Sequence, residues 1–436
     1  MTKTYLVWLT TLLFSQWAAF ASTISLTEAQ RLELANLVVS DGEAKKEFQT
    51  LRREADASIK DRGRPSARIS TAGRLAADPQ KVKSLVSLED MKKLYALGYS
   101  YAVTSNSAYS AAARRIIINW AKANQPTGTP IDDTKLEPLF VAYDLTRSAF
   151  SASERITIED WLRKMVRLEL QSALTNSVTA RNNWNSHRLK VVGLIAFLLD
   201  DADLIKYAVE GFKMQIEANL RPDGSSSDFH QRDALHYHCY DLEPLLILAV
   251  TARQKGIDLY HYRSPSGASL AKSVEFLVPY CDGTRTHAEW VHTKVKLDRA
   301  RAEAGEKGFS PGSAFDPREA RGVLELASFF DESYKPLAVR LYNKGAGHYP
   351  SWQAVLNRVR KWRRYCWHGS VELLTPSQQC ALNLSPVAHA VRFANGPVPC
   401  PATSHSPLGN LFAQMRSSAS SPQAGESPAP KYCQII

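Results

Sequence analysis

The chain has 436 residues, of which 44% are hydrophobic and 22% charged, and its formal net charge is +11. This length permits one large domain or two to three average ones, and the composition is that of an ordinary globular protein rather than a disordered chain. The positive charge fits a polyanionic partner, which could be a nucleic acid, an anionic lipid or an acidic polysaccharide, and charge alone does not choose among them.

The first 21 residues have the pattern of an export signal. Lys3 precedes an apolar run over residues 5–14, and Ala19-Phe20-Ala21 gives the small-x-small pattern of a cleavage site before Ser22. The run is too short for a comfortable membrane span, which favours a cleaved signal peptide over an anchor. We therefore expect a secreted or periplasmic protein that has no membrane association after cleavage.

Six cysteines occur, with no CxxC pair and no metal-finger spacing. An exported chain can form disulfides, and a structural role is favoured over catalysis for Cys239. We expect no cofactor and no metal, because a zinc site built from His230, His236 and His238 would need a bend or a strand at a position where a helix is predicted.

Helical periodicity dominates the chain from residue 27, and alternating strand patterns are rare. Ile158, Trp161, Met165 and Leu168, for example, recur three and four residues apart. Residues 62–77, with two glycines and a proline, are predicted to form a loop. The predicted helices span residues 27–39, 43–59, 87–103, 107–123, 136–146, 153–174, 183–199, 202–219, 234–254, 267–278, 286–304, 317–330 and 335–342.

Short links between consecutive helices indicate helical hairpins that pack side by side. We therefore expect an all-α fold, a helical toroid or barrel, in a domain spanning residues 85–350. Residues 22–84 are predicted to form an N-terminal helical extension. Residues 351–436 begin with a basic, aromatic segment and continue as a poorly ordered tail rich in proline and serine.

Two polar clusters run directly into apolar helices, at residues 181–190 and 232–244. In the first, Asn183 and His187 are four residues apart and share a helical face, as do Trp184 and Arg188. In the second, Arg232, His236 and Tyr240 would occupy successive turns, with Tyr237 three residues before Tyr240. His238 would point away from His236 by about 200°. Two helices could thus direct polar side chains into one cleft.

Asn, His, Arg and Tyr together suit β-elimination on a uronic acid. Hydrogen bonds to the uronate carboxylate stabilise the enolate-like transition state that forms when the C5 proton is removed. A neutral His or a deprotonated Tyr can act as the base, and a Tyr hydroxyl can protonate the departing O4. The product would carry a 4,5-unsaturated uronate.

The order of these pieces resembles the alginate lyase superfamily of polysaccharide lyases. The matching residues are Asn182-Asn183 with His187, the run from Ala234 to Tyr240, and the run from Thr286 to Arg299. The resemblance covers roughly residues 87–301, about half of the chain. It implies an incomplete (α/α) toroid and an anionic polysaccharide substrate, such as alginate, polymannuronate or glucuronan.

The resemblance also implies roles for individual residues. Asn183 would neutralise the carboxylate, His187 would neutralise it or act as the base, and Tyr240 would be the acid, or both acid and base. Two departures from the family pattern stand out: three residues separate Asn-Asn from His, and Asp233 occupies the place of an Arg seven residues before the catalytic Tyr. Arg232 or Arg188 could substitute for that Arg. The expected substrate-binding residues are Trp184, Arg188, Arg232, His236, Tyr237, His238, Glu289, Lys294 and Arg299.

Other functions remain open at this point. A helical-toroid glycoside hydrolase would need two carboxylates, and Asp228, Asp233, Asp241 and Glu243 are the nearby supply. A non-catalytic protein that binds anionic glycans is a further alternative. Nucleic-acid binding is less favoured, because of the export signal and the lack of a binding motif, and the sequence gives no oligomeric state.

Overall fold

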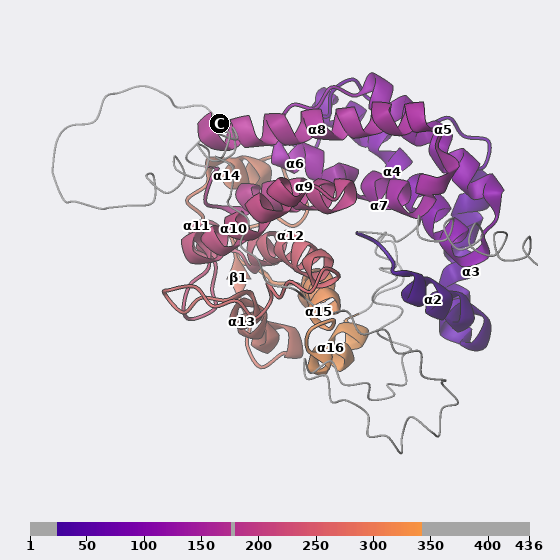
Figure 1. Cartoon of the computed structure of the whole chain (residues 1–436). Helices are drawn as coiled ribbons and strands as arrows, with labels where there is room; N and C mark the ends of the chain where they lie inside the picture. The colour runs from indigo at the N-terminus through magenta and orange to yellow at the C-terminus, as the bar shows by residue number, and fades with distance from the viewer. Residues whose placement is uncertain (1–23, 176–178, 342–436) are drawn as a thin grey trace, which may run out of the picture. The chain divides into compact units, whose positions relative to one another are not determined.

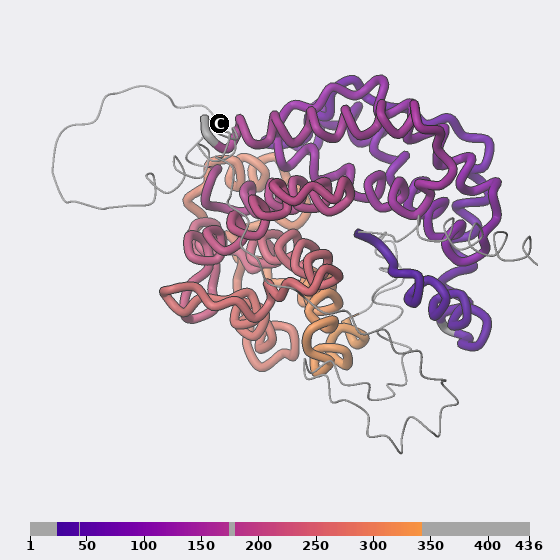
Figure 2. The backbone as a smooth tube through the Cα atoms, viewed as in Figure 1, coloured from indigo at the N-terminus to yellow at the C-terminus, as the bar shows by residue number. Residues whose placement is uncertain are grey.

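The computed structural model describes residues 24–175 and 179–341. The predicted signal peptide and the predicted basic segment and tail lie outside these residues. The described helices belong to one compact unit, shown in Figures 1 and 2. No helix among them is long and apolar enough to cross a membrane.

The described part of the chain is almost entirely helical. The α-helices are α2 (Glu28–Ser40), α3 (Gly42–Ser58), α4 (Pro79–Thr104), α5 (Ser107–Ala123), α6 (Pro130–Asp133), α7 (Glu137–Thr146), α8 (Ala152–Thr175), α9 (Asn183–Leu199), α10 (Ala202–Asn219), α11 (Ser227–Arg232), α12 (Leu235–Arg253), α13 (Leu270–Asp282), α14 (Lys296–Glu303), α15 (Arg321–Ala327) and α16 (Lys335–Arg340). Short 3-10 helices are η2 (Thr134–Leu136), η3 (Arg147–Ala149), η4 (Pro317–Ala320) and η5 (Glu332–Tyr334). Strands β1 (Ala288–Glu289) and β2 (Ser313–Ala314) form one antiparallel pair.

The predicted bounds of α5, α9 and α10 agree with the structure, and the caps explain why. The Asn182 side chain accepts a hydrogen bond from the backbone N–H of Trp184 and so begins α9. The Asp201 side chain likewise accepts a hydrogen bond from the backbone N–H of Leu204 and begins α10. Such side chains satisfy N–H groups that have no partner within the helix, so they fix where a helix starts.

The predicted helix over residues 286–304 is wrong. This segment contains β1, a turn and only then the short α14. Trp290 has a positive φ of 69°, and its N–H donates to the Asp233 carbonyl at 2.7 Å, while the N–H of Lys294 donates to the Gln231 carbonyl at 2.9 Å. These N–H groups bind another segment, so they are not available for a continuous helix.

The predicted stripe of Arg232, His236 and Tyr240 on one helix is also wrong. Arg232 is the last residue of α11, a helix that was not predicted, and Asp233 follows it in the left-handed conformation with a φ of 53°. α12 starts only at Leu235. The break redirects the chain, so Arg232 does not occupy the turn below His236.

Helices α4, α7, α9, α12 and α15 pack in a row, each against the next (Figure 1). α9 and α12 run parallel: Ser186 hydrogen-bonds to Asp241 near their N-terminal ends, and Gly193 lies against Leu248 farther along. α7 runs parallel to α9, because Glu137 contacts Lys190 and, farther along both helices, Arg147 contacts Leu198. α15 runs parallel to α12, because Glu243 lies near Gly322 and Arg253 contacts Phe329. The N-terminal ends of the four parallel inner helices, α7, α9, α12 and α15, therefore lie on the same side of the row.

Helices α5, α8, α10 and α13 pack against this row from outside. α10 runs antiparallel to α9, because Asn185 bonds to Gln215 at 2.8 Å while Gly193 lies near Ala208. Figure 2 traces these consecutive hairpins. Parallel inner helices joined through outer returning helices are the arrangement of an incomplete (α/α) toroid, as expected from the sequence.

α9 is the most extensively buried helix of the row, because residues 186–198 are all buried. Its Leu, Ile, Val and Phe side chains contribute roughly 1.5–3 kcal/mol each through removal from water. Gly193 lets α12 approach closely, since a Cβ there would meet the Leu248 side chain. This packing fixes the position of the α9 N-terminus.

We predict that Gly193→Ala lowers the free energy of unfolding by about 1–3 kcal/mol, because the added methyl overpacks the α9–α12 contact. Urea unfolding followed by circular dichroism measures the change. Gly42→Ala is the control, because a Cβ at that exposed position meets no atom within 4 Å. Additional Leu248→Ala should relieve the clash, so strictly additive effects of the two changes would contradict this account.

Candidate active site

Polar side chains gather where the inner helices begin. Helix N-termini carry partial positive charge from unpaired N–H groups, so several of them pointing to one region favour an anionic ligand. The residues at these ends are Thr134 and Lys135 before α7, Asn183 to His187 on α9, His236 to Tyr240 on α12, and Glu319 on η4 before α15.

A buried polar network holds the start of α9 against α11 and α12. The Asp228 carboxylate accepts hydrogen bonds from the Asn183 backbone N–H at 2.8 Å and from the Asn183 side-chain amide at 2.5 Å. Asn219 donates to both Asp228 and Asp241, and Ser186 donates to Asp241 at 2.6 Å. Burial raises the pKa of both carboxyl groups. Asn183 thus lies buried on the first turn of α9 with one amide hydrogen bound to Asp228, and its role in neutralising a substrate carboxylate stays a prediction.

His187 has one bound and one unbound ring nitrogen. Nδ1 lies 3.0 Å from the Thr134 hydroxyl, whereas the buried Nε2 has no hydrogen-bond partner among the described residues. Burial first, and then the charges of Lys190 and Lys135, hold the pKa of His187 well below its usual range, against a smaller opposing contribution from the Tyr240 backbone. The imidazole is therefore neutral at physiological pH, as a general base requires.

Tyr240 lies beside this histidine, as the sequence predicted. The two ring centroids are 4.4 Å apart. Burial, followed by the nearby Tyr237 and Glu243, raises the pKa of Tyr240 above its usual value, so its hydroxyl keeps its proton. The rings of His236 and Tyr240 are nearly parallel, with centroids 6.5 Å apart, and His236 Nδ1 is 2.5 Å from the Glu319 carboxylate.

Tyr237 lies one turn before Tyr240 and contacts two arginines. Its hydroxyl accepts a hydrogen bond from Arg301 at 3.1 Å, and the guanidinium of Arg232 lies 3.7 Å from its ring centroid. Arg232 also pairs with Asp298 at 2.5 Å. Arg232 and Tyr237 therefore belong to the same cluster, although Arg232 reaches it from α11.

Arg188 does not lie in the cleft, and the expectation that it contacts the substrate is corrected. Its side chain is fully buried and pairs with Glu169 of α8 at 3.4 Å. It also donates to Asn185 at 3.0 Å. One residue step on a helix turns the side chain by about 100°, so the neighbour of His187 points toward the outer helix instead.

His238 and Glu289 have structural partners, which corrects their expected contact with substrate. His238 is fully buried, with Nδ1 2.9 Å from the Ser226 hydroxyl and Nε2 3.0 Å from the Ser273 carbonyl. The Glu289 carboxylate accepts hydrogen bonds from the N–H groups of Leu235 and His236. It caps α12 from a distant segment, since Ala234 has no capping side chain.

The other predicted binding residues, Trp184, Lys294 and Arg299, all remain at least partly exposed. Trp184 is half-buried on the first turn of α9, and Lys294 and Arg299 are exposed. Arg299 donates to the Thr293 carbonyl at 3.0 Å. Among the described residues no cluster of His, Cys, Asp or Glu has the geometry to hold a metal ion.

Thr134, Glu319 and Arg301 complete the cluster and were not predicted. Nothing in their local sequence marks them, because each becomes relevant only through a partner at least 53 residues away. One signal was available: Thr134 lies two residues before a predicted helix, and Glu319 lies in the first turn of another. In a row of parallel helices, residues at helix starts meet at one end.

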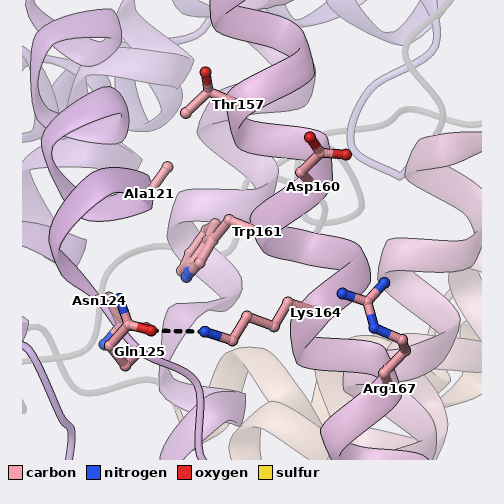
Figure 3. A pocket seen from close by; sticks show the side chains of 8 residues that line it. All are labelled: Ala121, Asn124, Gln125, Thr157, Asp160, Trp161, Lys164 and Arg167. Atoms are coloured by element: carbon pink, nitrogen blue, oxygen red, sulfur yellow. Dashed lines mark hydrogen bonds between the residues drawn. The ribbon is translucent and has the colours of Figure 1, made fainter.

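A pocket of about 440 Å³ lies elsewhere, between the end of α5 and the middle of α8. Figure 3 shows its lining, where Lys164 donates to Gln125 at 2.6 Å beside Trp161. None of the predicted site residues lines this pocket. The candidate active site is therefore at the N-terminal ends of the inner helices and not in this pocket.

We predict that protonation of His238 destabilises the fold in acid. Burial lowers its pKa from 6.5 to about 4, so its stabilising contribution is complete above pH 6.5 and is lost as the pH falls toward 4. The loss amounts to about 3 kcal/mol. His238→Gln keeps a donor and an acceptor without titrating, so the stability difference between wild type and variant, measured by urea unfolding, should change over this range. A difference that is constant with pH would contradict the prediction.

Comparison with known proteins agrees with this fold. The model of the alginate lyase family matches residues 38–290, which include Asn183, His187 and Tyr240. A protein named polysaccharide lyase from Stenotrophomonas maltophilia (strain K279a) is 30% identical over 198 residues, which are 43% of this chain and 56% of that protein. The chain thus spans only about half the length of this curated relative.

A solved structure is also similar. An alginate lyase from Bacteroides ovatus superimposes with a TM-score of 0.56 and 17% identity, covering 77% of this chain and 99% of that one. At this identity the likeness shows the fold alone. The family match, in contrast, extends over more than half of the sequence, and the chain belongs to the alginate lyase family.

Proposed function

We propose that this protein is a polysaccharide lyase that cleaves a uronic-acid polysaccharide by β-elimination and leaves 4,5-unsaturated uronate ends. The observation that carries the proposal is the contact between the neutral His187, with its unbound Nε2, and the protonated Tyr240. Membership of the alginate lyase family supports the reaction class.

The two residues have the protonation states that elimination needs. Thr134 can accept the Nδ1 hydrogen of His187, which leaves a lone pair on Nε2 to take the C5 proton. Tyr240 retains its own proton and can deliver it to the departing O4. Two neighbouring groups whose environments push their pKa values in opposite directions form a suitable acid–base pair.

Their closeness also bears on the substrate. Ring centroids 4.4 Å apart support a base and an acid that act from the same side of a bound sugar. In mannuronate and glucuronate the C5 proton and O4 lie on the same face, whereas in guluronate they lie on opposite faces. We therefore propose polymannuronate or glucuronan as the substrate rather than polyguluronate.

Hydrolysis is supported less well, because two of the four nearby carboxylates, those of Asp228 and Asp241, are committed, which leaves Asp233 and Glu243 from that set. Asp228 and Asp241 are buried and bound to Asn183, Asn219 and Ser186. A glycosidase needs two carboxyl groups that reach opposite sides of the glycosidic bond. Side chains without access to the cleft cannot do so.

Tyr237 is a second candidate for proton transfer. The Arg301 guanidinium that donates to its hydroxyl would stabilise negative charge on that oxygen. In that case a Tyr237 that has lost its hydroxyl proton to solvent, and not His187, would take the C5 proton, and Tyr240 would remain the acid.

We predict that Tyr240→Phe lowers kcat about 10²–10⁴-fold, because the acid is lost while the ring is retained. The rise of ultraviolet absorbance from the new double bond measures turnover on polymannuronate, polyguluronate, glucuronan and hyaluronan. Tyr237→Phe and His187→Gln, assayed in parallel, identify the base by the larger loss. The half-buried Tyr101, whose hydroxyl lies 3.3 Å from the Ser148 hydroxyl, provides a matched control, Tyr101→Phe, which should behave as wild type.

Each alternative gives a different signal in this assay. New reducing ends without an absorbance change would show hydrolysis. Binding of the polymers without any turnover would show a non-catalytic glycan-binding protein. Full activity of Tyr240→Phe would remove Tyr240 from the mechanism.

We further propose that the protein acts in the periplasm or outside the cell, where its polymer substrate would be found. The pattern of residues 1–21 supports this. N-terminal sequencing of the exported protein should give Ser22 as the first residue. A mature chain that retains Met1 would contradict cleavage.

A further inference from the structure

A uronate lyase must neutralise the carboxylate next to C5, and most cations at the helix ends already have a partner. Arg188 pairs with Glu169, Arg232 with Asp298, and Lys190 with Glu137 at 2.5 Å. Arg301 binds the Tyr237 hydroxyl and lies close to Asp298 and Glu306. None of these offers an uncommitted charge.

Lys135 differs from them. It lies on η2, directly after Thr134, whose hydroxyl contacts His187. Its side chain is half-buried, and among the described residues its ammonium group has neither a hydrogen bond nor an ion pair. His187 lies within the electrostatic reach of Lys135 and Lys190. Lys135 is therefore a free cation beside the proposed base.

The surroundings of Lys135 make its charged ammonium group costly when no anion is bound to it. Burial lowers its pKa, and the charges of Lys190 and Lys81 lower it further. Asp132 is the nearby acid that opposes this effect, but its Oδ1 already accepts three hydrogen bonds, from the N–H and hydroxyl of Thr71 and the N–H of Ala72. A partly buried cation without a partner is costly, and an incoming carboxylate would offset that cost.

We propose that Lys135 binds the carboxylate of the uronate whose C5 proton is removed, and so determines specificity for acidic over neutral sugars. The inference rests on the proposed lyase function and adds a residue that sequence analysis did not single out. Lys135 follows the residue whose hydroxyl contacts His187, and on this assignment it neutralises the carboxylate beside C5 while His187 removes the C5 proton. The carboxylate would accept from the ammonium group while His187 Nε2 approaches C5.

The test compares an acidic polymer with its methyl ester, which carries no negative charge at this position. Lys135→Met should lower kcat/KM on polymannuronate or glucuronan on the order of 10²-fold, as expected for loss of an electrostatic contact to the transition state. Its activity on the methyl ester should equal that of wild type. Lys135→Arg should restore part of the activity on the acid.

Two controls separate recognition from structure. Lys122→Met removes an exposed lysine of α5 and should leave both activities unchanged. Thermal unfolding of Lys135→Met should match wild type, and Lys135→Gln replaces it if the methionine variant folds poorly. Equal losses on both substrates, or activity on the acid within about threefold of wild type, would overturn the assignment.

Failure of the lyase proposal gives a different result. A wild type that turns over neither polymer would refute the reaction. The role of Lys135 would then be decided by equilibrium binding of a mannuronate oligosaccharide. Tighter binding by wild type than by Lys135→Met supports carboxylate recognition, and equal binding refutes it.

Discussion

The parallel packing of α9 against α12 is the constraint on which the site depends. It places the first turn of α9 beside the first turn of α12, so His187 meets Tyr240 although 53 residues separate them in the chain. Two features fix this register: the contact of Gly193 with Leu248 and the hydrogen bond from Ser186 to Asp241. A shift of one turn would separate the two rings.

The buried acids next to this contact connect the starts of the helices. Asp228 and Asp241 are removed from water and bound by amides and a hydroxyl from α9 and α10. Buried carboxyl groups are tolerated only when their hydrogen bonds are complete, so the network permits few other arrangements. It fixes the helix starts without contributing a group that could reach a substrate.

The charge distribution follows from the same architecture. Burial first, and then the charges of Lys190 and Lys135, keep the imidazole of His187 neutral. The same lysines and the helix N-termini favour a polyanion nearby. A single arrangement thus serves both substrate attraction and the protonation state of the proposed base. The excess of basic residues in the whole chain is consistent with this local field but does not locate it.

The sequence by itself determined most of the helices and the shared helix of Asn183 and His187, because both follow from local pattern. Apolar periodicity and side-chain caps defined α5, α9 and α10, and i to i+4 spacing identified Asn183 and His187. Only the tertiary structure decided that Arg188, His238 and Glu289 serve the scaffold, that Arg232 comes from a separate helix, and that Thr134, Lys135, Glu319 and Arg301 join the cluster. The physical reason is that spacing along one helix gives the direction of a side chain relative to its neighbours in sequence, whereas its partner depends on which helix packs on that face.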